Sequence, residues 1–199
     1  MSSNKPFSQA CENNKHPILN KLAPLLQKQQ QVLEIGSGTG QHAVYFASAL
    51  RNIHWQCSDR QENLAGIGAW IADAKLDNLA PPICLDVHDR NWPTQHFDMI
   101  YSANTLHIMS WHEVTLFFRQ LKHCLAKEGL LCVYGPFNYD GKFSSPSNAQ
   151  FDQWLNQRDH QSGIRDFEAI DQLAQKIGLT LQADHKMPAN NQLLIWQAH

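Results

Sequence analysis

The sequence predicts an α/β fold in which a mostly parallel sheet has helices on both of its faces. Apolar segments of strand length alternate with helical patterns along most of the chain, and the first such segment ends at a cluster of three glycines. Strands that alternate with helices form a parallel sheet through right-handed crossovers. The strand segments are almost continuously apolar, which is typical of strands that are buried on both faces.

Five strands are expected before residue 135. They are predicted at residues 31–35, 54–57, 82–85, 97–101 and 130–134, and the helices between them at about 41–50, 61–75 and 112–126. In the last helix the apolar residues recur with the period of one helix face; they are Val114, Phe117, Phe118, Leu121 and Leu125.

Both ends of the chain depart from this alternation. Near the N-terminus Pro17 suits the first turn of a helix, and we expect a helical cap at about 8–28. Near the C-terminus Asp166 is the expected N-cap of a helix at about 167–177, which Gly178 ends. Two further strands, 179–187 and 192–197, are joined by a short turn and must therefore form an antiparallel hairpin. We expect one domain, 1–199, with a seven-stranded sheet.

The composition excludes several broad classes of protein. Hydrophobic residues make up 43% of the 199 residues, so a packed core is expected and disorder is not. Lys and Arg number 16 against 18 Asp and Glu, which leaves no basic surface for nucleic acid. No apolar run approaches the roughly 18 residues that span a bilayer, and the first residues lack the apolar core of a signal peptide. We expect neither a nucleic-acid nor a membrane partner.

The cysteines and histidines do not form a metal-binding pattern. The five cysteines lack CxxC spacing, and none of the eleven histidines falls in HxH or HExxH spacing. We expect reduced, buried thiols in a cytoplasmic protein, no metal site, and a monomer rather than an oligomer.

The glycine cluster is the most informative segment. Gly36, Gly38 and Gly40 lie between an expected strand and an expected helix. Gly36 permits a tight turn, Gly38 lets a ligand approach the backbone, and Gly40 lets the helix pack close to the strand. Free N–H groups of this loop, including that of Ser37, face a ligand and favour negative charge. The alternative is a turn that serves only the fold.

The spacing of the glycines narrows the choice of ligand. The GxGxG pattern differs from the GxGxxG of dinucleotide sites, because Gln41 stands where the third glycine would fall, and no GK[ST] of a P-loop is present. Glu34, two positions before the first glycine, completes an E-x-G-x-G-x-G sequence that resembles the first motif of class I S-adenosylmethionine (SAM) methyltransferases. In that interpretation the helix start holds the methionine carboxylate of SAM, and Glu34 helps to hold its ammonium group.

Acidic residues at the ends of the next two strands fit the same cofactor. Asp59 can accept hydrogen bonds from both ribose hydroxyls, although a turn or N-cap role is the alternative. In methyltransferases an acid at the place of Asp86 takes the adenine amino group between apolar neighbours such as Val87. Arg60 either lies over the adenine or is a solvated surface residue. Asn104, just beyond the fourth strand, completes the predicted cofactor contacts.

Several subclasses of methyltransferase can be set aside. The [DN]PP[YF] motif of adenine and glutamine N-methyltransferases is absent after the fourth strand, where the chain reads Ser102-Ala103-Asn104-Thr105. The acids that divalent-metal O-methyltransferases need are also absent. A metal-free enzyme that acts on a small molecule remains.

Beyond the glycine loop, the chain resembles the methyltransferase-like family whose human member is methyltransferase-like protein twenty-six. The resemblance runs from about Cys11 to the C-terminus and implies the Rossmann-like class I methyltransferase fold without naming a substrate. One departure is Asn13, where that family often has Arg. The motifs that carry the resemblance include Glu12-Asn13-Asn14-Lys15, Leu85-Asp86-Val87, Tyr134-Gly135-Pro136, Gly163-Ile164-Arg165-Asp166 and Met187-Pro188-Ala189-Asn190-Asn191.

The substrate is expected at the carboxyl ends of the strands, where ligands bind in open parallel sheets. The connection at about 135–166 is too long for a plain loop and is predicted to be a substrate-side insertion. The predicted substrate-binding residues lie on this connection, at its start or on the C-terminal turn; they are Tyr134, Asn148, Arg165, Asn190 and Asn191. Structural alternatives are a strand end for Tyr134, a helix cap for Arg165 and a tight turn for Asn190 and Asn191.

His107 is the predicted catalytic residue, because a neutral imidazole can accept a proton near pH 7. A buried histidine bonded to the backbone is the alternative. The sequence therefore predicts SAM-dependent methyl transfer to a small molecule, with S-adenosylhomocysteine (SAH) as the product. A SAM-binding regulatory or scaffold protein is the second interpretation, and a nicotinamide dehydrogenase is disfavoured by the glycine spacing.

Overall fold

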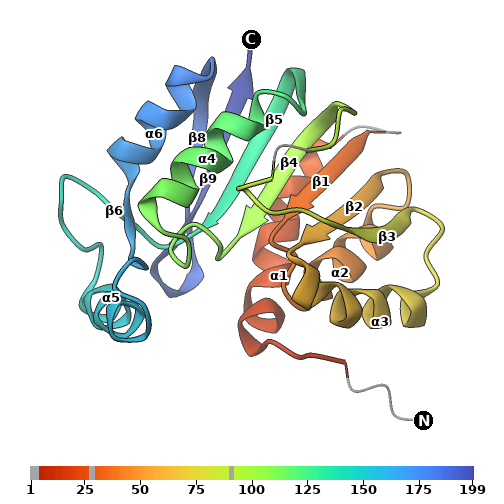
Figure 1. Cartoon of the computed structure of the whole chain (residues 1–199), viewed down its shortest axis with the longest axis horizontal. Coiled ribbons are helices and arrows are strands. Elements are labelled where there is room, and N and C mark those ends of the chain that lie inside the picture. The colour runs from red at the N-terminus through yellow and green to blue at the C-terminus, as the bar shows by residue number, and fades with distance from the viewer. Residues whose placement is uncertain (1–4, 27–29, 90–91) are drawn as a thin grey trace. The chain divides into compact units, whose positions relative to one another are not determined.

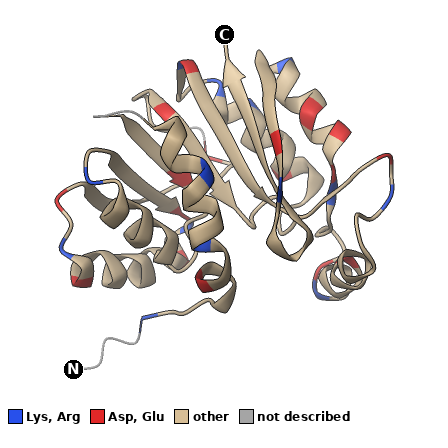
Figure 2. Ribbon diagram, turned by 180° about the vertical axis from the view of Figure 1, so that it is seen from behind, with Lys and Arg blue, Asp and Glu red and all other residues tan. Residues whose placement is uncertain are grey.

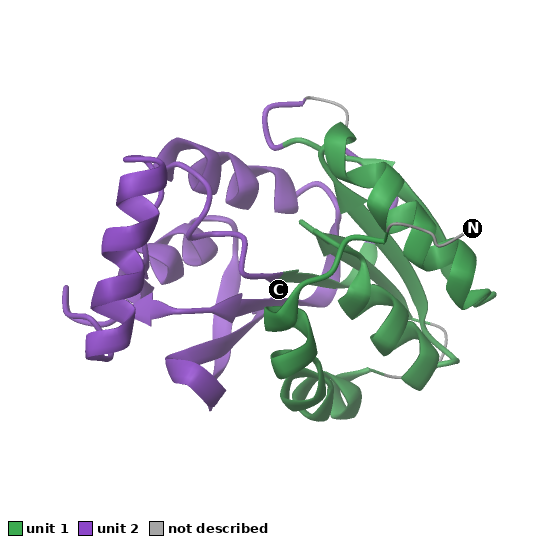
Figure 3. Ribbon diagram, turned by 90° about the horizontal axis from the view of Figure 1, so that it is seen from below, with its two compact units in different colours: residues 1–86, 97–102 green, residues 87–96, 103–199 purple. Residues whose placement is uncertain are grey.

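The computed structural model describes residues 5–26, 30–89 and 92–199. The chain forms two compact units, which Figure 3 colours separately. Unit 1 contains residues 1–86 and 97–102, and unit 2 contains residues 87–96 and 103–199. The expectation of a single domain stays a prediction. The last two residues of the predicted N-terminal cap, 27 and 28, lie outside the described residues.

Unit 1 holds the glycine loop and the parallel strands. Its strands are β1 (Gln31–Ile35), β2 (His54–Asp59), β3 (Leu79–Cys84) and β4 (Phe97–Ala103), and they pair in parallel in the order β3-β2-β1-β4. Its helices are α1 (Gln9–Leu22), α2 (Gln41–Ala49) and α3 (Leu64–Ala74), with short 3-10 turns at Ala23–Leu25 and Gln61–Asn63. The three helices lie side by side on one face of these strands (Figure 1).

An aromatic cluster forms the core of unit 1 beneath these helices. Phe46 of α2 packs against Trp55 of β2 and Tyr101 of β4, with ring centroids 5.4 and 5.6 Å apart. All three side chains are at most 1% exposed. Aromatic side chains of this size contribute more buried apolar area than any others, so this cluster fixes how α2 sits on the sheet.

Unit 2 holds the antiparallel strands and the predicted insertion. Strand β9 (Asn191–Ala198) lies between β5 (Leu125–Gly135) and β8 (Leu179–Met187) and is antiparallel to both. Helices α4 (Trp111–Leu121) and α6 (Phe167–Lys176) lie together on one face of these strands (Figure 1). The insertion contains β6 (Phe137–Asn138), α5 (Pro146–Arg158) and β7 (Arg165–Asp166), and β6 pairs with β7. A last 3-10 turn, Pro188–Asn190, joins β8 to β9.

The predicted fold class is confirmed. The seven strands form one sheet in the order β3-β2-β1-β4-β5-β9-β8, mostly parallel with an antiparallel hairpin strand inserted near one edge. In Figure 2 the strands are mostly tan, while the acidic and basic positions are scattered over helices and loops. None of the helices in the described part of the chain combines the length and apolar character needed to cross a membrane.

Three details of the prediction were wrong. Pro17 lies inside α1, because Ser8 caps this helix through the backbone N–H of Cys11 and so starts it eight residues earlier. The helix expected to reach residue 126 ends at Leu121, since Leu125 already belongs to β5. Cys84 is exposed rather than buried, because β3 is an edge strand.

The structure predicts unequal effects of alanine at two of the loop glycines. Both have positive φ, 57° at Gly38 and 86° at Gly40, but only at Gly40 would a Cβ meet backbone, at 3.2 Å from the Cα of Ile67. Gly38→Ala should cost about 1–2 kcal/mol of unfolding free energy from the left-handed conformation alone. Gly40→Ala should cost about 2–4 kcal/mol, because the clash with α3 adds to it. Urea unfolding of both variants measures this difference, and equal losses would contradict the packing argument.

Candidate functional site

The glycine loop is held by one carbonyl at the end of the neighbouring strand. The N–H groups of Gly36 and Ser37 both donate to the backbone oxygen of Ser58, each at 3.0 Å. A further bond from the N–H of Gly40 to the oxygen of Ser37, at 2.9 Å, closes the turn into α2. Gly36, Gly38 and Gly40 all have positive φ, a conformation that glycine adopts without strain.

The second and third glycines have different roles. A Cβ at Gly38 would meet no atom within 4 Å, so the space beside its backbone is open to a ligand. Gly40 instead faces Ile67 and Trp70 of α3. Gly40 was expected to let α2 pack closely on the strand. This expectation was wrong, because the element that packs closely against Gly40 is helix α3.

Asp59 is buried at the end of β2 and is already a triple acceptor. Its Oδ2 accepts from the N–H of Gly38 at 2.6 Å, and its Oδ1 accepts from the N–H of Arg60 at 2.8 Å and from Asn63 Nδ2 at 2.7 Å. A carboxylate offers about four acceptor positions. A bidentate bond to two ribose hydroxyls therefore requires one present donor to leave, and the side chain of Asn63 is the one that can turn away.

Glu34 is buried within unit 1, with 2% of its surface exposed. Its Oε2 accepts a hydrogen bond of 3.0 Å from Trp55 Nε1. Burial raises the pKa of the Glu34 carboxyl to about 7, because the charged form loses its hydration. The charged form would be stabilised by an ammonium group nearby, as the predicted role requires.

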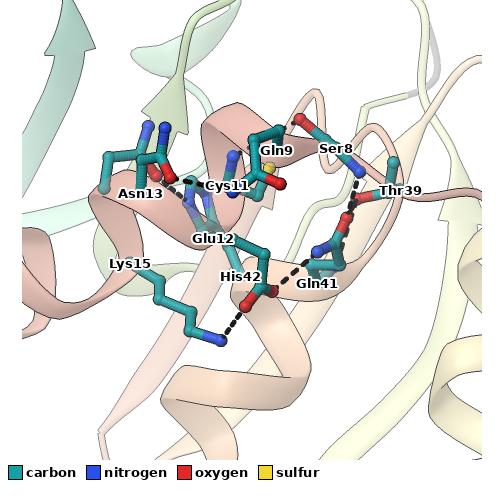
Figure 4. A network of polar contacts seen from close by, with 10 residues as sticks. Ser8, Gln9, Cys11, Glu12, Asn13, Lys15, Thr39, Gln41 and His42 are labelled. Carbon is teal, nitrogen blue, oxygen red and sulfur yellow. Dashed lines mark hydrogen bonds and ion pairs between the residues drawn. The ribbon is translucent and has the colours of Figure 1, made fainter.

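The N-terminal helix is tied to the glycine loop by a polar network that the sequence analysis did not predict (Figure 4). Gln41 Oε1 accepts from the N–H of Ser8 at 2.6 Å and from Thr39 Oγ1 at 3.0 Å. Gln41 Nε2 donates to Glu12 Oε1 at 2.8 Å, and Lys15 pairs with the other oxygen of Glu12. Gln41 stands where a dinucleotide loop has its third glycine. Its polar side chain at this position was the sequence signal from which the network could have been predicted.

A second contact joins the same two helices. The Nε2 atom of His42, on α2, lies 2.6 Å from Asn14 Oδ1, and its Nδ1 atom lies 3.3 Å from the hydroxyl of Tyr101. Burial lowers the pKa of His42 to about 4. The ring is therefore neutral at pH 7 and has a structural role in unit 1. Asn13, which departs from the family pattern, is exposed and bonded to Gln9.

The remaining predicted adenosine contacts differ in exposure. Arg60 is exposed and forms an ion pair of 3.1 Å with Glu62, in keeping with the solvated alternative. Asp86 is half-buried and lies two residues beyond the end of β3. The N–H of the preceding Leu85 donates to the carbonyl of Asp59 at 2.9 Å, which brings this segment to the end of β2. Val87 is buried and belongs to unit 2.

In unit 2, two predicted site residues are joined through the backbone. The N–H of Asn104 donates to the oxygen of Tyr134 at 2.8 Å, and Asn104 has a left-handed φ of 55°. The Tyr134 side chain is buried, with 2% exposed. Tyr134 thus shows the strand-end packing that was its structural alternative.

His107 is buried beside the end of β5. Its ring packs edge-on against Phe151 at 5.3 Å, and its Nδ1 lies 3.7 Å from where a Cβ of Gly135 would be. No hydrogen bond joins the ring nitrogens to a residue that the structure describes; the backbone oxygen of His107 accepts from Gly163 at 2.9 Å. Burial, with a smaller effect of the nearby Arg165 charge, lowers the pKa of His107 to about 4, so the ring is neutral at pH 7.

Arg165 connects the insertion to the segment that carries His107. Its Nε donates to the carbonyl of Leu106 at 3.1 Å, and its Nη2 donates to the carbonyls of Met109 and, at 2.9 Å, Gln161. These bonds hold residues 106–109 in place. They use three of the five N–H donors of the guanidinium, which leaves fewer for the predicted carboxylate-binding role.

Asn148 and Asn190 join the start of α5 to the β8–β9 turn. Asn148 Nδ2 donates to the backbone oxygen of Asn190 at 3.0 Å, and Asn190 Nδ2 donates to Ser147 Oγ, also at 3.0 Å. Asn191 bonds back to the carbonyls of Pro188 and Ala189. The structure therefore brings these three predicted residues together, with much of their hydrogen-bonding capacity used within the protein.

The described residues contain no group of three or more His, Cys, Asp or Glu side chains arranged to hold a metal ion. A family model described as "Protein of unknown function (DUF938)" matches residues 5–198. The fold is also similar to solved structures of methyltransferases that share little sequence with this chain.

An O-methyltransferase family protein from Burkholderia thailandensis has a TM-score of 0.82 at 15% identity, over 95% of this chain and 57% of that one. An O-methyltransferase family 2 protein from Planctomyces limnophilus, in complex with apigenin, has a TM-score of 0.80 at 14% identity, over 96% and 60%. CalO1, a methyltransferase in calicheamicin biosynthesis solved with SAH bound, has a TM-score of 0.71 at 14% identity, over 87% and 50%. This chain thus spans little more than half the length of these structures.

The raised pKa of Glu34 predicts a pH-dependent effect of Glu34→Gln. Between about pH 4.5 and 7 the folded chain keeps a proton that the unfolded chain releases, so the Glu34 contribution to stability is lost as pH rises through this window. The amide still accepts from Trp55 and cannot ionise. At pH 8 the variant should be more stable than the native chain by about 1–3 kcal/mol, with little difference at pH 5.

Urea unfolding at the two pH values measures the effect, and Glu62→Gln, an exposed carboxylate, is the matched control. A loss of stability at both pH values in Glu34→Gln would contradict the buried, near-neutral carboxyl.

Proposed function

We propose that this chain, which belongs to the DUF938 family, is a SAM-dependent methyltransferase that acts on a small molecule. The observation that carries the proposal is the glycine loop, with an open approach to Gly38 beside the buried carboxylate of Asp59. The similarity to SAM-dependent methyltransferases, one solved with SAH bound, supports it. The resemblance of the sequence to the methyltransferase-like protein twenty-six family supports the same assignment.

The residues of unit 1 fit the parts of SAM. The positive-φ loop and the start of α2 would hold the methionine carboxylate, because N–H groups at a helix start favour an anion. Glu34 would stabilise the ammonium group, and Asp59 would accept from the ribose. Asp86 would take the adenine amino group. When bound, SAM would supply the methyl group. An electron pair of the methyl acceptor would form the new bond to the methyl carbon, and the electron pair of the broken S–C bond would stay on sulfur.

When the methyl acceptor arrives protonated, His107 is the residue proposed to take its proton. Its ring is neutral at pH 7, so a nitrogen lone pair is available for the proton that the nucleophile loses. A pKa of about 4 makes it a weak base, which suits an acceptor that loses its proton as the new bond forms. The rest of the catalysis is expected from positioning and exclusion of water.

A second candidate function is a SAM-binding regulatory or scaffold protein without transferase activity. The internal bonding of Arg165, Asn148 and Asn190 favours it, because these side chains were predicted to bind substrate. Transfer of a labelled methyl group from SAM to a metabolite extract separates the two functions. The five free cysteines are in keeping with the proposed cytoplasmic location.

SAM and SAH should stabilise the chain, and NAD should not. At a concentration one hundred times the dissociation constant, a ligand that binds only the native state adds about 2.7 kcal/mol to the free energy of unfolding. Thermal melts with each ligand measure this effect as a rise in Tm. No rise with millimolar SAM, or a clear rise with NAD, would reject the cofactor assignment.

Substitutions at Asp59 and Asn63 should separate a ligand contact from an internal one. Asp59→Ala removes a charged acceptor and the anchor of Gly38, so SAH affinity should fall about tenfold to a hundredfold. Asn63→Ala removes only the donor that competes with the ribose, so affinity should stay within a few-fold or rise. Calorimetry measures both, and a larger loss in Asn63→Ala than in Asp59→Ala would contradict the ribose role.

A further inference from the structure

A hollow of about 400 Å³ lies within unit 2, at the end of the β8–β9 hairpin. Gln192 lines it together with Tyr139, Asp184, Lys186 and Met187. Its volume is in the range of pockets that bind small molecules. Asn190 and Asn191, which were predicted to bind substrate, line it too, whereas the five residues named above were not predicted to bind a ligand.

Gln192 carries a buried polar atom without a partner in the described part of the chain. The side chain is 8% exposed, and its Oε1 accepts no hydrogen bond from a described residue. An unsatisfied buried acceptor costs about 1–3 kcal/mol, so such groups are rare unless a ligand or water completes them. Because the amide turns easily about its last torsion, it can present this oxygen to the hollow.

The register of the strands places Gln192 on the same face of the sheet as the side chain of His107. Gln192 is the cross-strand partner of Gly135 in β5, and cross-strand partners project from the same face of a sheet. A Cβ on Gly135 would point toward His107 Nδ1, at 3.7 Å. Gln192 and His107 therefore flank the space that Gly135 leaves free, on one face at the carboxyl end of β5.

The rim of the hollow carries one charge of each sign. Lys186 pairs with Gln192 across the hairpin, and Asp184 lies two residues before it on the same face. Asp184 Oδ2 accepts from the hydroxyl of Tyr139 at 2.7 Å, which fixes the carboxylate at the hollow. A ligand that carries both an N–H donor and a carboxylate meets an acceptor in Gln192 and Asp184 and a cation in Lys186.

We infer that this hollow binds the methyl acceptor and that the acceptor is a zwitterionic small molecule of the amino-acid type, with its amine on Gln192 and Asp184 and its carboxylate on Lys186. The inference rests on the proposed function only in calling the ligand a methyl acceptor. The binding site itself consists of residues of unit 2.

The test is a titration of the full chain with each standard amino acid, followed by saturation-transfer NMR. At least one should bind at millimolar concentration or below, and its analogues that lack the amine or the carboxylate should bind about tenfold more weakly or worse. If no amino acid binds, or if the analogues bind as well as the parent, the inference is overturned.

Gln192→Leu is the decisive variant. The ligand-free Tm should stay the same or rise by a few degrees, because an unpaired buried polar group is removed, while affinity for the amino acid falls about tenfold or more. Gln197→Leu, at the other end of β9, should leave affinity unchanged. If the folded Gln192→Leu variant binds the amino acid as tightly as the native chain does, the inference is overturned.

Two rim variants and one cofactor measurement complete the design. Lys186→Met should weaken binding of the amino acid but not of its decarboxylated amine, and Asp184→Asn should weaken both. SAH affinity should be unaffected by Gln192→Leu. If the native chain binds the amino acid but not SAH, the proposed function fails while the hollow remains a binding site; the reverse result overturns only this inference.

Discussion

Unit 1 depends on a small set of hydrogen bonds that hold the glycine loop against the end of β2. The carbonyl of Ser58 receives two N–H groups of the loop, and the carboxylate of Asp59 receives a third from Gly38. These bonds are possible because the three glycines adopt positive φ, which would strain any other residue. The loop is therefore shaped before any ligand arrives, so little ordering free energy is spent on binding.

The surroundings of this loop combine stable packing with buried polar groups. Glu34 and His42 both lie where the charged form is disfavoured, and each has a hydrogen-bonding partner that reduces the cost of burial. Gln41 and Glu12 extend the same network to α1. The N-terminal helix is thus joined to the glycine loop by polar contacts whose geometry is specific, in addition to the packing of its buried Ile18 and Leu22. Loss of the Glu12 carboxylate, for example, would leave the amide nitrogen of the buried Gln41 without this acceptor.

Unit 2 shows a different use of polar residues. Arg165, Asn148 and Asn190 hold loops together by bonding to backbone carbonyls and to one another. Such bonds give these segments a fixed shape. Asn138 Oδ1 has no such bond to a described residue. In the proposed site the same is true of the ring of His107 and of the Oε1 of Gln192. The proposed chemistry of this unit therefore rests on these two residues.

The sequence alone determined the succession of strands and helices, the glycine loop and the C-terminal hairpin, because period, glycine spacing and turn length are local properties of the chain. The order of the strands in the sheet came only from the structure. Strand 179–187 was predicted to the residue, and 31–35 likewise. The place of Pro17 within α1 was missed, since the helix begins after a cap at Ser8, which gains strength from a contact with Gln41, far along the chain. Of the candidate site, the sequence predicted the glycine loop, which is a backbone motif, but not the contacts of the side chains. Whether Arg165 meets a carbonyl or a ligand, and whether Gln192 has a partner, depends on side chains that folding brings together, and only the tertiary structure decided it.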